Sequence, residues 1–466
     1  MFPPNTRRSF LLLLTTLLLM ALTVHSVLGA GPVNNVNGRQ TDNAGLRSEI
    51  EFRQSLGFRS DPDYIRAVHA SRDAVGFMGM GAKFTPTEAE ELRVRTDLEH
   101  DGETLHRHFM GDSNLRGAFG GIYLDHQAGG QLVLQLVHDH ALNEQIPSML
   151  PHLQHPDRLR VEDVEWPEQR LQQQFDTLSD AAVSSRYPEL QAIAIDQVTN
   201  RVVVLIQPTT VSGAMGGEVP KNALPAAIAT LLADPSVVVR EGQVLDVPTQ
   251  GGAMMAGYGW GVTTGSTSCT LGFEVVRNGN PSMLTAGHCV NSIAAGTTIY
   301  NFSTAIGTFS GDYQDGAVSN SGYGIDVGIH RMTNAATATD NIHQGGNPSL
   351  DVTGALGSSD YFIGAIRCFR GKNSGTICGS TTRASLTYQS PLNQRWYRDM
   401  FTIDPVTQEG DSGGPVYRDN NNGTAAAAGI VRGYINIANV TTNNDGVFSK
   451  WYNAANLFGL TLVTTD

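Results

Sequence analysis

The hexapeptide GDSGGP at residues 410–415 has the residue types that expose a serine hydroxyl as a nucleophile. Glycines on both sides of Ser412 allow a tight turn with backbone conformations that other residues resist, and they let a substrate carbonyl approach the main chain closely. A serine hydroxyl is a weak nucleophile, so it needs a neighbouring base and hydrogen-bond donors for the oxyanion that its attack creates. The stretch therefore predicts acyl-transfer chemistry if the chain supplies those partners.

The order of residues along the chain indicates where the base lies. The same hexapeptide also fits the looser Gly-x-Ser-x-Gly turn of α/β-hydrolases, in which the catalytic histidine follows the serine. Here the last histidine, His343, precedes Ser412, so the base has to lie upstream. The best candidate is His288 in TAGHC at residues 285–289, because an imidazole titrates near neutral pH and can both accept and donate the proton. The competitors His330 and His343 lie in no motif and are expected to be ordinary surface or loop histidines.

A third residue must hold the tautomer of the base. Asp326 lies between His288 and Ser412 within YGIDVGI at residues 323–329, where apolar residues alternate. Burying a carboxylate in such a segment is costly unless it is paired, so Asp326 is the predicted partner of His288. Three other acids of this interval stand among polar turn residues and are expected to be solvated loop acids. They are Asp312, Asp315 and Asp340.

TAGHC followed by GDSGGP resembles the motifs of the chymotrypsin-like serine peptidases, and most closely their secreted bacterial branch of streptogrisins and α-lytic-type enzymes. The resemblance implies an all-β catalytic domain over residues 251–466, made of two six-stranded antiparallel β-barrels with the site between them. It implies Ser412, His288 and Asp326 as nucleophile, base and orienting acid, and an oxyanion hole formed by the backbone amides of Gly410 and Ser412. Such chemistry requires no metal ion and no cofactor.

The composition of the chain suits this organisation. Residues 251–466 contain short β-rich runs separated by Gly, Asn, Ser and Thr, which is the pattern of an all-β domain, with helical periodicity only near residues 450–457. Residues 1–30 combine two arginines, a Leu-rich run and small residues, which predicts an export signal of the general secretory or twin-arginine type. That apolar run is short for a membrane span.

Residues 31–250 contain no cysteine and read as a charged α+β region. A capping box at residues 85–88 predicts a helix through about Leu98, and another helix is expected over residues 167–178. Two segments, 122–134 and 193–204, read as strand, polar turn, strand. The region resembles the propeptides of α-lytic-type peptidases, which act as folding chaperone and inhibitor. An unrelated accessory domain or a permanent binding module is the alternative.

The turn-rich residues 246–257 suit a linker, and we expect propeptide processing within them. All four cysteines follow this window, and four cysteines allow three pairings. The resemblance implies the pairs Cys269–Cys289 and Cys368–Cys378. A zinc site is disfavoured because the spacing lacks a short Cys-x2-Cys unit.

The substrate pocket can be assigned only through the resemblance, which carries over five residues: Val406, Glu409, Arg432, Gly433 and Tyr434. Val406 stands where trypsin-like enzymes keep an acid, which disfavours basic residues, and no histidine lies where glutamate-specific relatives have one. An apolar or aromatic preference remains by elimination. Tyr434 departs from the small residue of relatives, and Glu409 adds a charge at the rim. Asp411 would anchor the turn through a buried ionic contact.

The resulting hypothesis is a secreted, extracellular serine endopeptidase made as a zymogen. Its expected partners are protein or peptide substrates and its own propeptide, and it is expected to be a monomer without a membrane association once the signal is removed. Most of the formal net charge of −13 lies before residue 251, and no basic patch suggests nucleic acid. The alternative is a catalytically idle secreted relative that acts as a binding protein.

Overall fold

The structure is a computed structural model that describes residues 37–464 with several internal gaps. Those gaps are residues 78–80, 139–145, 185–186, 188, 208–218, 221–223, 225, 249–255, 266–267, 302–303, 318–323, 334–339, 345–346 and 438–443. The expected export signal and most of the expected processing window therefore lie outside the described residues. Among the residues that are described, no helix has the length and apolar character that a membrane span requires. Met1–Gly45 and Leu46–Asp466 form two compact units, and the fold described below is that of the second.

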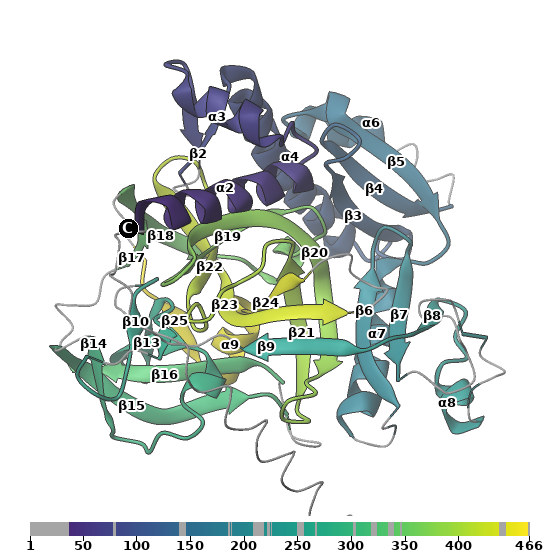
Figure 1. The fold of residues 1–466 in the computed structure, drawn as a ribbon. Coiled ribbons are helices and arrows are strands. Elements are labelled where there is room, and N and C mark those ends of the chain that lie inside the picture. Colours follow the sequence, from purple (N-terminus) through teal and green to yellow (C-terminus); the bar gives the residue numbers. More distant parts are fainter. Residues whose placement is uncertain are drawn as a thin grey trace, which may run out of the picture. The chain divides into compact units, whose positions relative to one another are not determined.

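The N-terminal region up to Pro248 contains the helices and strands of an α+β arrangement (Figure 1). The main helices are α2 (Asn37–Ser55), α3 (Pro62–Ala70), α4 (Pro86–Gly111), α6 (Ile146–Met149), α7 (Glu168–Val183) and α8 (Ala226–Leu231). The strands are β1 (Val75–Phe77), β2 (Ala82–Phe84), β3 (Phe119–Asp125), β4 (Gln131–Val137), β5 (Leu159–Val164), β6 (Leu190–Asp196), β7 (Arg201–Ile206), β8 (Val237–Glu241) and β9 (Val244–Pro248).

The local predictions for this region are largely confirmed. Thr85 and Glu88 form the expected capping box at the start of α4. The two strand–turn–strand segments are the antiparallel hairpins β3–β4 and β6–β7. The predicted end of the first helix near Leu98 is wrong, because α4 continues to Gly111. The added turns place Leu105 and Phe109 in a buried cluster with the strands β3 and β4, and this packing outweighs the many charged residues of the helix.

The C-terminal region is built from strands, as the sequence predicts. One sheet has the order β14-β15-β16-β13-β12-β25 and contains six strands among the described residues. Its members are β12 (Glu274–Arg277), β13 (Asn280–Thr285), β14 (Thr298–Asn301), β15 (Thr304–Asp315), β16 (Asp326–Met332) and β25 (Leu460–Leu462). The short strands β10 (Gly259–Trp260) and β11 (Cys269–Thr270) pair with each other, and α9 (Trp451–Phe458) is the expected C-terminal helix.

The second sheet crosses from the C-terminal region into the N-terminal region. Its C-terminal members are β17 (Asn341–Gln344), β18 (Asn347–Ala355), β19 (Ile366–Gly371), β20 (Gly375–Gln389), β21 (Trp396–Ile403), β22 (Pro415–Asp419), β23 (Thr424–Ile437) and β24 (Asp445–Lys450). The long strand β20 also pairs with β6, with Thr387 opposite Ile193, so that β6, β7 and β8 extend the same sheet. Pairing of this kind covers an edge that would otherwise expose unpaired backbone groups. The all-β class of this region is confirmed, and closure of the sheets into barrels stays a prediction.

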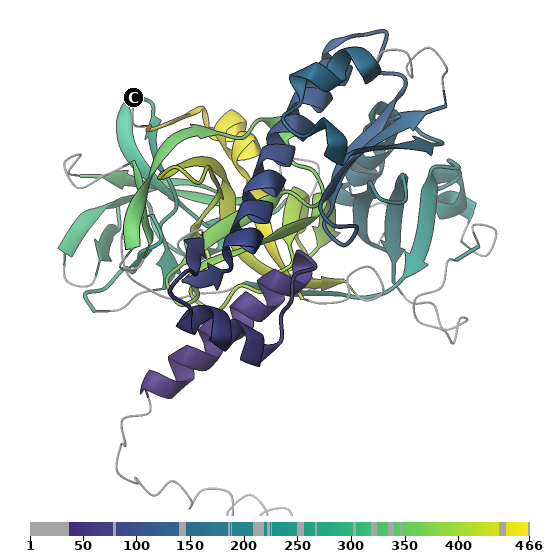
Figure 2. The ribbon, with the colours of Figure 1, turned by 90° about the horizontal axis from the view of Figure 1, so that it is seen from above.

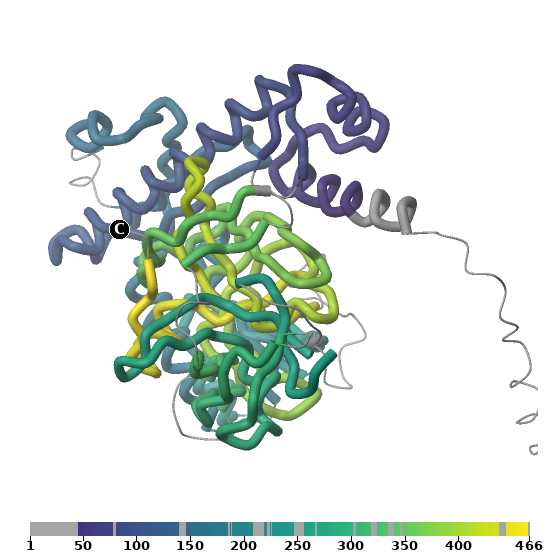
Figure 3. The backbone as a smooth tube through the Cα atoms, turned by 90° about the vertical axis from the view of Figure 1, so that its left-hand side faces the viewer, coloured from purple at the N-terminus to yellow at the C-terminus, as the bar shows by residue number. Residues whose placement is uncertain are grey.

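Helices of the N-terminal region also pack against the C-terminal strands. Phe52, Leu56 and Leu92 belong to the same buried cluster as Val352 and Ile366. Figure 2 shows α4, in dark blue, beside these strands, and Figure 3 shows the purple helices on one side of the teal-to-yellow chain. The two regions therefore share apolar cores as well as a sheet.

A buried ion pair fixes α4 to β19. The carboxylate of Glu99 lies 2.6 Å from Arg367 Nη1 and accepts a second hydrogen bond from the backbone amide of Ile366 at 2.5 Å. Both side chains of the pair are 1% exposed. Removing one charge leaves the other buried without a counter-ion, which is far more destabilising than losing an exposed pair.

Glu99→Gln is therefore expected to lower the free energy of unfolding of the full chain by about 3–5 kcal/mol. Urea unfolding followed by tryptophan fluorescence measures the change, with Ser412→Ala in every chain compared so that the predicted nucleophile is absent. The matched control on the same helix is Glu90→Gln, since Glu90 is exposed and its ion pair among the described residues is with Arg93. The control should change stability by less than about 1 kcal/mol. Equal effects of the two substitutions would contradict the assignment.

Candidate active site

His288 and Asp326 are brought together by two adjacent strands. His288 lies in the short turn Gly287–Cys289 that follows β13, and Asp326 is the first residue of β16, which pairs with β13. The Asp326 carboxylate accepts two hydrogen bonds from the histidine, one from the backbone amide at 2.8 Å and one at 2.6 Å involving Nδ1. A side chain at Gly287 would lie 1.9 Å from the carbonyl oxygen of Gln314, so only glycine allows this close approach.

The Asp326 carboxylate stays ionised although it is completely buried. Burial alone would raise its pKa, but the charges and hydrogen bonds of His288, with a smaller contribution from Arg432, hold the pKa of Asp326 below its ordinary value. An ionised acceptor at Nδ1 favours the tautomer in which Nε2 is free of a proton and can act as a base. The pair predicted from sequence therefore has the geometry and charge that the chemistry needs.

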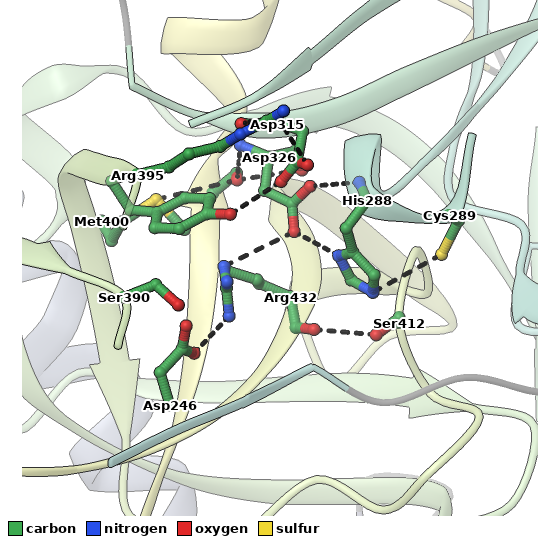
Figure 4. Close-up of polar contacts among 12 residues, drawn as sticks. Asp246, His288, Cys289, Asp315, Asp326, Ser390, Arg395, Met400, Ser412 and Arg432 are labelled. Atoms are coloured by element: carbon green, nitrogen blue, oxygen red, sulfur yellow. Dashed lines mark hydrogen bonds and ion pairs between the residues drawn. The ribbon is translucent and has the colours of Figure 1, made fainter. Parts of the chain in front are cut away.

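Ser412 lies in the turn between Gly410 and Gly413, which have φ angles of 110° and 91°. A Cβ atom on Gly413 would lie 2.2 Å from the carbonyl oxygen of Thr270. This position therefore requires glycine both because its φ angle is positive and because the Thr270 carbonyl leaves no space for a side chain. The hydroxyl of Ser412 is buried and donates a hydrogen bond to the carbonyl oxygen of Arg432 at 2.7 Å. Figure 4 shows His288, Asp326, Ser412 and Arg432 as one group of side chains.

The neighbouring strand β11 holds this turn in place. The backbone amide of Thr270 donates to the carbonyl oxygen of Ser412 at 2.7 Å, and the Thr270 hydroxyl donates to the carbonyl oxygen of Gly410 at 2.6 Å. Cys269 beside it is bonded to Cys289, which follows His288, and the second disulfide is Cys368–Cys378. Both expected pairings are confirmed, and the first one links the histidine turn to the strand that supports the serine turn.

Asp411 is held differently from what the resemblance implied. Its carboxylate accepts hydrogen bonds from the Ser374 hydroxyl and from the backbone amides of Gln408, Asn373 and Ser374. Among the described residues it forms no ion pair within 4.0 Å, so the expected ionic anchor is replaced by a cage of neutral donors. Burial raises the pKa of Asp411, and the hydrogen bonds act against that rise.

The other acids of the interval are not all solvated. Asp315 is buried, its carboxylate forms an ion pair with Arg395 at 2.7 Å, and it accepts a hydrogen bond from the Tyr397 hydroxyl at 2.7 Å. The prediction of a solvated loop acid is wrong for this residue because partners from β21 and the turn before it cover it. Asp312 is half-buried and pairs with Arg277. Neither acid contacts His288, so Asp326 is the acid of the group.

His330 is also wrongly predicted, since it lies in β16 and is completely buried rather than on the surface. Its ring packs edge-on against Trp260 at 4.1 Å and against Phe309 at 6.1 Å between ring centroids. Neither ring nitrogen has a hydrogen-bond partner among the described residues. Burial lowers the pKa of His330 from 6.5 to about 3, so the folded protein keeps this ring neutral.

This histidine should weaken the fold in acid. In the unfolded chain His330 binds a proton below pH 6.5, whereas in the native protein it binds one only below about pH 3. The free energy of unfolding therefore decreases as the pH falls from 6.5 to about 3. His330→Phe is expected to be more stable than the wild type at pH 4.5 by about 3 kcal/mol, relative to their difference at pH 8. Urea unfolding at the two pH values measures this. His343→Phe is the control, since His343 is partly exposed and packs on Tyr258. If the free energy of unfolding of His330→Phe falls between pH 8 and pH 4.5 as much as that of the wild type, the assignment is refuted.

The residues carried over as substrate-binding differ in exposure. Val406 and Tyr434 are half-buried, Glu409 is exposed, and Arg432 and Gly433 are buried in β23. The edge of β23 at Gly433 and Tyr434 is paired with the chain's own β9. In that antiparallel register Pro248 lies opposite Gly433 and Val247 lies opposite Tyr434.

Sequence reasoning missed Asp246 as part of the site, and it predicted a substrate contact for Arg432 but not the contacts of its side chain with Asp246 and Asp326. Arg432 forms an ion pair with Asp246 of β9, and its Nε lies 3.6 Å from Asp326 Oδ2. Both residues stand in no motif, and only an apolar alternation around Asp246 could have drawn attention to a buried acid. Cys269, His288 and Cys289 place ligand-type atoms within 4.8 Å of one another. The two sulfurs are joined in a disulfide, so they offer no thiolate to a metal ion.

Comparison with known proteins identifies similar chains. Residues 266–457 match the family model described as Trypsin. Streptogrisin-A from Streptomyces griseus is 31% identical over 159 residues, which are 34% of this chain and 47% of the relative. Streptogrisin-D from the same organism is 26% identical over 225 residues, covering 42% of this chain and 53% of the relative. The chain thus spans about half the length of these curated relatives.

Two solved structures are also similar to part of the chain. Thermobifida fusca Protease A is 24% identical, with a TM-score of 0.35 over 46% of this chain and 100% of that chain. Cellulomonas bogoriensis chymotrypsin is 24% identical, with a TM-score of 0.33 over 46% of this chain and 98% of that chain.

Proposed function

We propose that the protein is a secreted serine endopeptidase made as a zymogen, and the match of residues 266–457 to the family model described as Trypsin supports this proposal. The observation that carries the proposal is the pair of hydrogen bonds by which buried Asp326 holds His288. A carboxylate in that position orients the imidazole and stabilises the imidazolium that forms during proton transfer. Ser412, in its glycine turn, is the nucleophile of the same group.

The reaction begins when the Ser412 hydroxyl turns from the carbonyl oxygen of Arg432 to Nε2 of His288. Ser412 Oγ then attacks the scissile carbonyl as His288 takes its proton, and the backbone amides of Gly410 and Ser412 stabilise the oxyanion. The protonated His288 gives the proton to the leaving amine, which leaves an acyl-enzyme on Ser412. Water, activated by the same histidine, releases the acyl group.

The proposed latency follows from β9, which occupies the edge of β23 at which a substrate would pair. β9 adds to β23 as an antiparallel strand at Gly433 and Tyr434, and peptide substrates commonly bind to an exposed sheet edge in this way. A substrate cannot pair with the same backbone groups while β9 holds them. The N-terminal region of residues 31–250 therefore acts as a propeptide, and its pairing with β20 through β6 supports a role in folding of the enzyme. Processing falls after Pro248 within the window of residues 246–257.

The pocket favours apolar or aromatic residues. Val406 replaces an acid at the pocket wall, and the nearby carboxyl of Asp404 is no substitute for it. Burial raises the pKa of Asp404 to about 8, so this group is largely neutral at pH 7 and gives little attraction to lysine or arginine. Glu409 lies exposed at the rim, where its charge is screened by solvent. Protein or peptide substrates are the only partners that this mechanism needs besides the propeptide.

Labelling with a biotinylated peptidyl phosphonate tests the activity, because such probes react only with an activated serine. The secreted wild-type protein should be labelled, and Ser412→Ala should not. An unlabelled wild-type protein whose β-rich fold is intact would favour the idle binding protein. Intact mass of the secreted product tests the zymogen, since a shed propeptide leaves a product that begins near residue 250, whereas a permanent binding module would remain attached.

A further inference from the structure

Arg432 lies completely inside the site with an acid on either side (Figure 4). Its guanidinium forms an ion pair with Asp246, and its Nε is 3.6 Å from Oδ2 of Asp326. The face of the guanidinium packs over the ring of Tyr397 at 3.9 Å from the ring centroid. The arginine is 1% exposed and both acids are 0% exposed, so one buried positive charge is shared by two buried carboxylates.

One of these two acids, Asp246, belongs to β9, the strand that occupies the edge of β23 at which a substrate would pair. Asp246 is the central residue of β9 and lies opposite Ile435 in the register with β23. Side chains alternate along a strand, and here Leu245 is 51% exposed whereas Asp246 faces inward. Tyr388 adds a hydroxyl that donates to Asp246 at 3.4 Å. The Asp246 carboxylate therefore occupies a buried binding site formed by the Arg432 guanidinium and the Tyr388 hydroxyl.

We propose that Arg432 is a specificity-determining residue that selects substrates with a carboxylate side chain at the strand position of Asp246. The inference rests on the proposed function, because it assumes that a substrate strand replaces β9 in the same register. An aspartate in that strand would restore the ion pair with Arg432. A neutral side chain would leave a buried guanidinium with Asp326 as its only close counter-ion, and a lysine would add a second positive charge.

The same contact links substrate choice to the catalytic group. Without an anion at the Asp246 position, Arg432 interacts more strongly with Asp326 and competes with the imidazolium of His288 for the same carboxylate. An acidic substrate residue shares the positive charge of Arg432 and leaves Asp326 to His288. An acidic peptide should therefore raise kcat as well as lower KM, which a purely steric pocket for aspartate would not do.

The test compares three peptides of residues 241–254 as substrates for the secreted wild-type enzyme. The first has the native sequence, and the second carries Asp246→Asn. The third exchanges two neighbours through Leu245→Asp and Asp246→Leu, which keeps the composition and net charge but moves the carboxylate to the outward face of the strand. The native peptide should be cleaved with a kcat/KM about 10- to 100-fold above both others, as expected for a hydrogen-bonded charge pair.

Enzyme variants then assign the preference to the arginine. Arg432→Gln should reduce the ratio between the native and Asp246→Asn peptides to about one, and Arg432→Lys should retain part of it. If Arg432→Gln does not fold, the double variant Arg432→Gln with Asp246→Asn is used instead, because it removes both buried charges together. A ratio that survives in these variants overturns the inference.

Casein serves as a general substrate that separates the two proposals. Casein hydrolysis without a preference for the native peptide overturns the inference and leaves the proposed function standing. Failure to hydrolyse casein and all three peptides refutes the proposed function itself.

Discussion

Ser412→Ala is expected to lower kcat for casein by about 10⁶-fold, to the level supported by binding and the oxyanion donors alone. Alanine removes the hydroxyl that donates to the carbonyl oxygen of Arg432, and this small change leaves the turn and its support by Thr270 intact. The second expected result is that the full-length chain persists, because the N-terminal region can no longer be removed by the protein itself. Casein hydrolysis and intact mass measure the two effects.

Two controls make this result specific. Ser359→Ala removes a half-buried hydroxyl that donates to Asp360 at 3.0 Å, far from the motif in sequence, and should change neither activity nor processing. Active wild-type enzyme added to the Ser412→Ala chain should cleave it near residue 250, which shows that the variant is folded and presents its processing site. Self-processing of Ser412→Ala in the absence of any other protease would contradict the role of this serine.

The parts of the site that could be predicted from the sequence are the residues that lie in short motifs with a recognisable chemical role. The residues GDSGGP and TAGHC constrain backbone conformation and reactivity within a few positions, and Asp326 stands out because an acid inside an apolar alternation must be paired. The hairpins β3–β4 and β6–β7 were predictable for a similar reason, since alternation and a turn signal are local.

The features that escaped prediction depend on pairing between distant segments. Asp246 and Arg432 are separated by 186 positions, and their contact exists only because β9 and β23 are in register. His330 resembles any histidine of a short strand, and its burial is decided by Trp260 and Phe309 from other strands. The extension of the second sheet through β20 and β6 has the same origin, because no local pattern states which edge a strand will join.

Contacts between the proposed propeptide and the proposed catalytic group supply a counter-charge that is present only in the uncut chain. Asp246 compensates Arg432, and Arg432 in turn helps to keep the pKa of Asp326 low although burial opposes this. Removal of β9 would take away one negative charge and leave the arginine beside the catalytic acid. The role of Asp326 is therefore best tested directly, in an enzyme that has already been processed.

Asp326→Asn is expected to lower kcat by about 10⁴-fold in the processed enzyme, with KM changing much less. The carboxylate accepts hydrogen bonds from both the backbone amide and the ring of His288, whereas an amide group would turn an N–H donor toward one of them. The ring would then carry its proton on Nε2 and could not accept the proton of Ser412. Trans-processing by wild-type enzyme supplies the cleaved variant for casein kinetics. Asp312→Asn, in the same interval but paired with Arg277, is the control and should keep activity within about twofold. A loss of less than tenfold in Asp326→Asn would remove this residue from the mechanism.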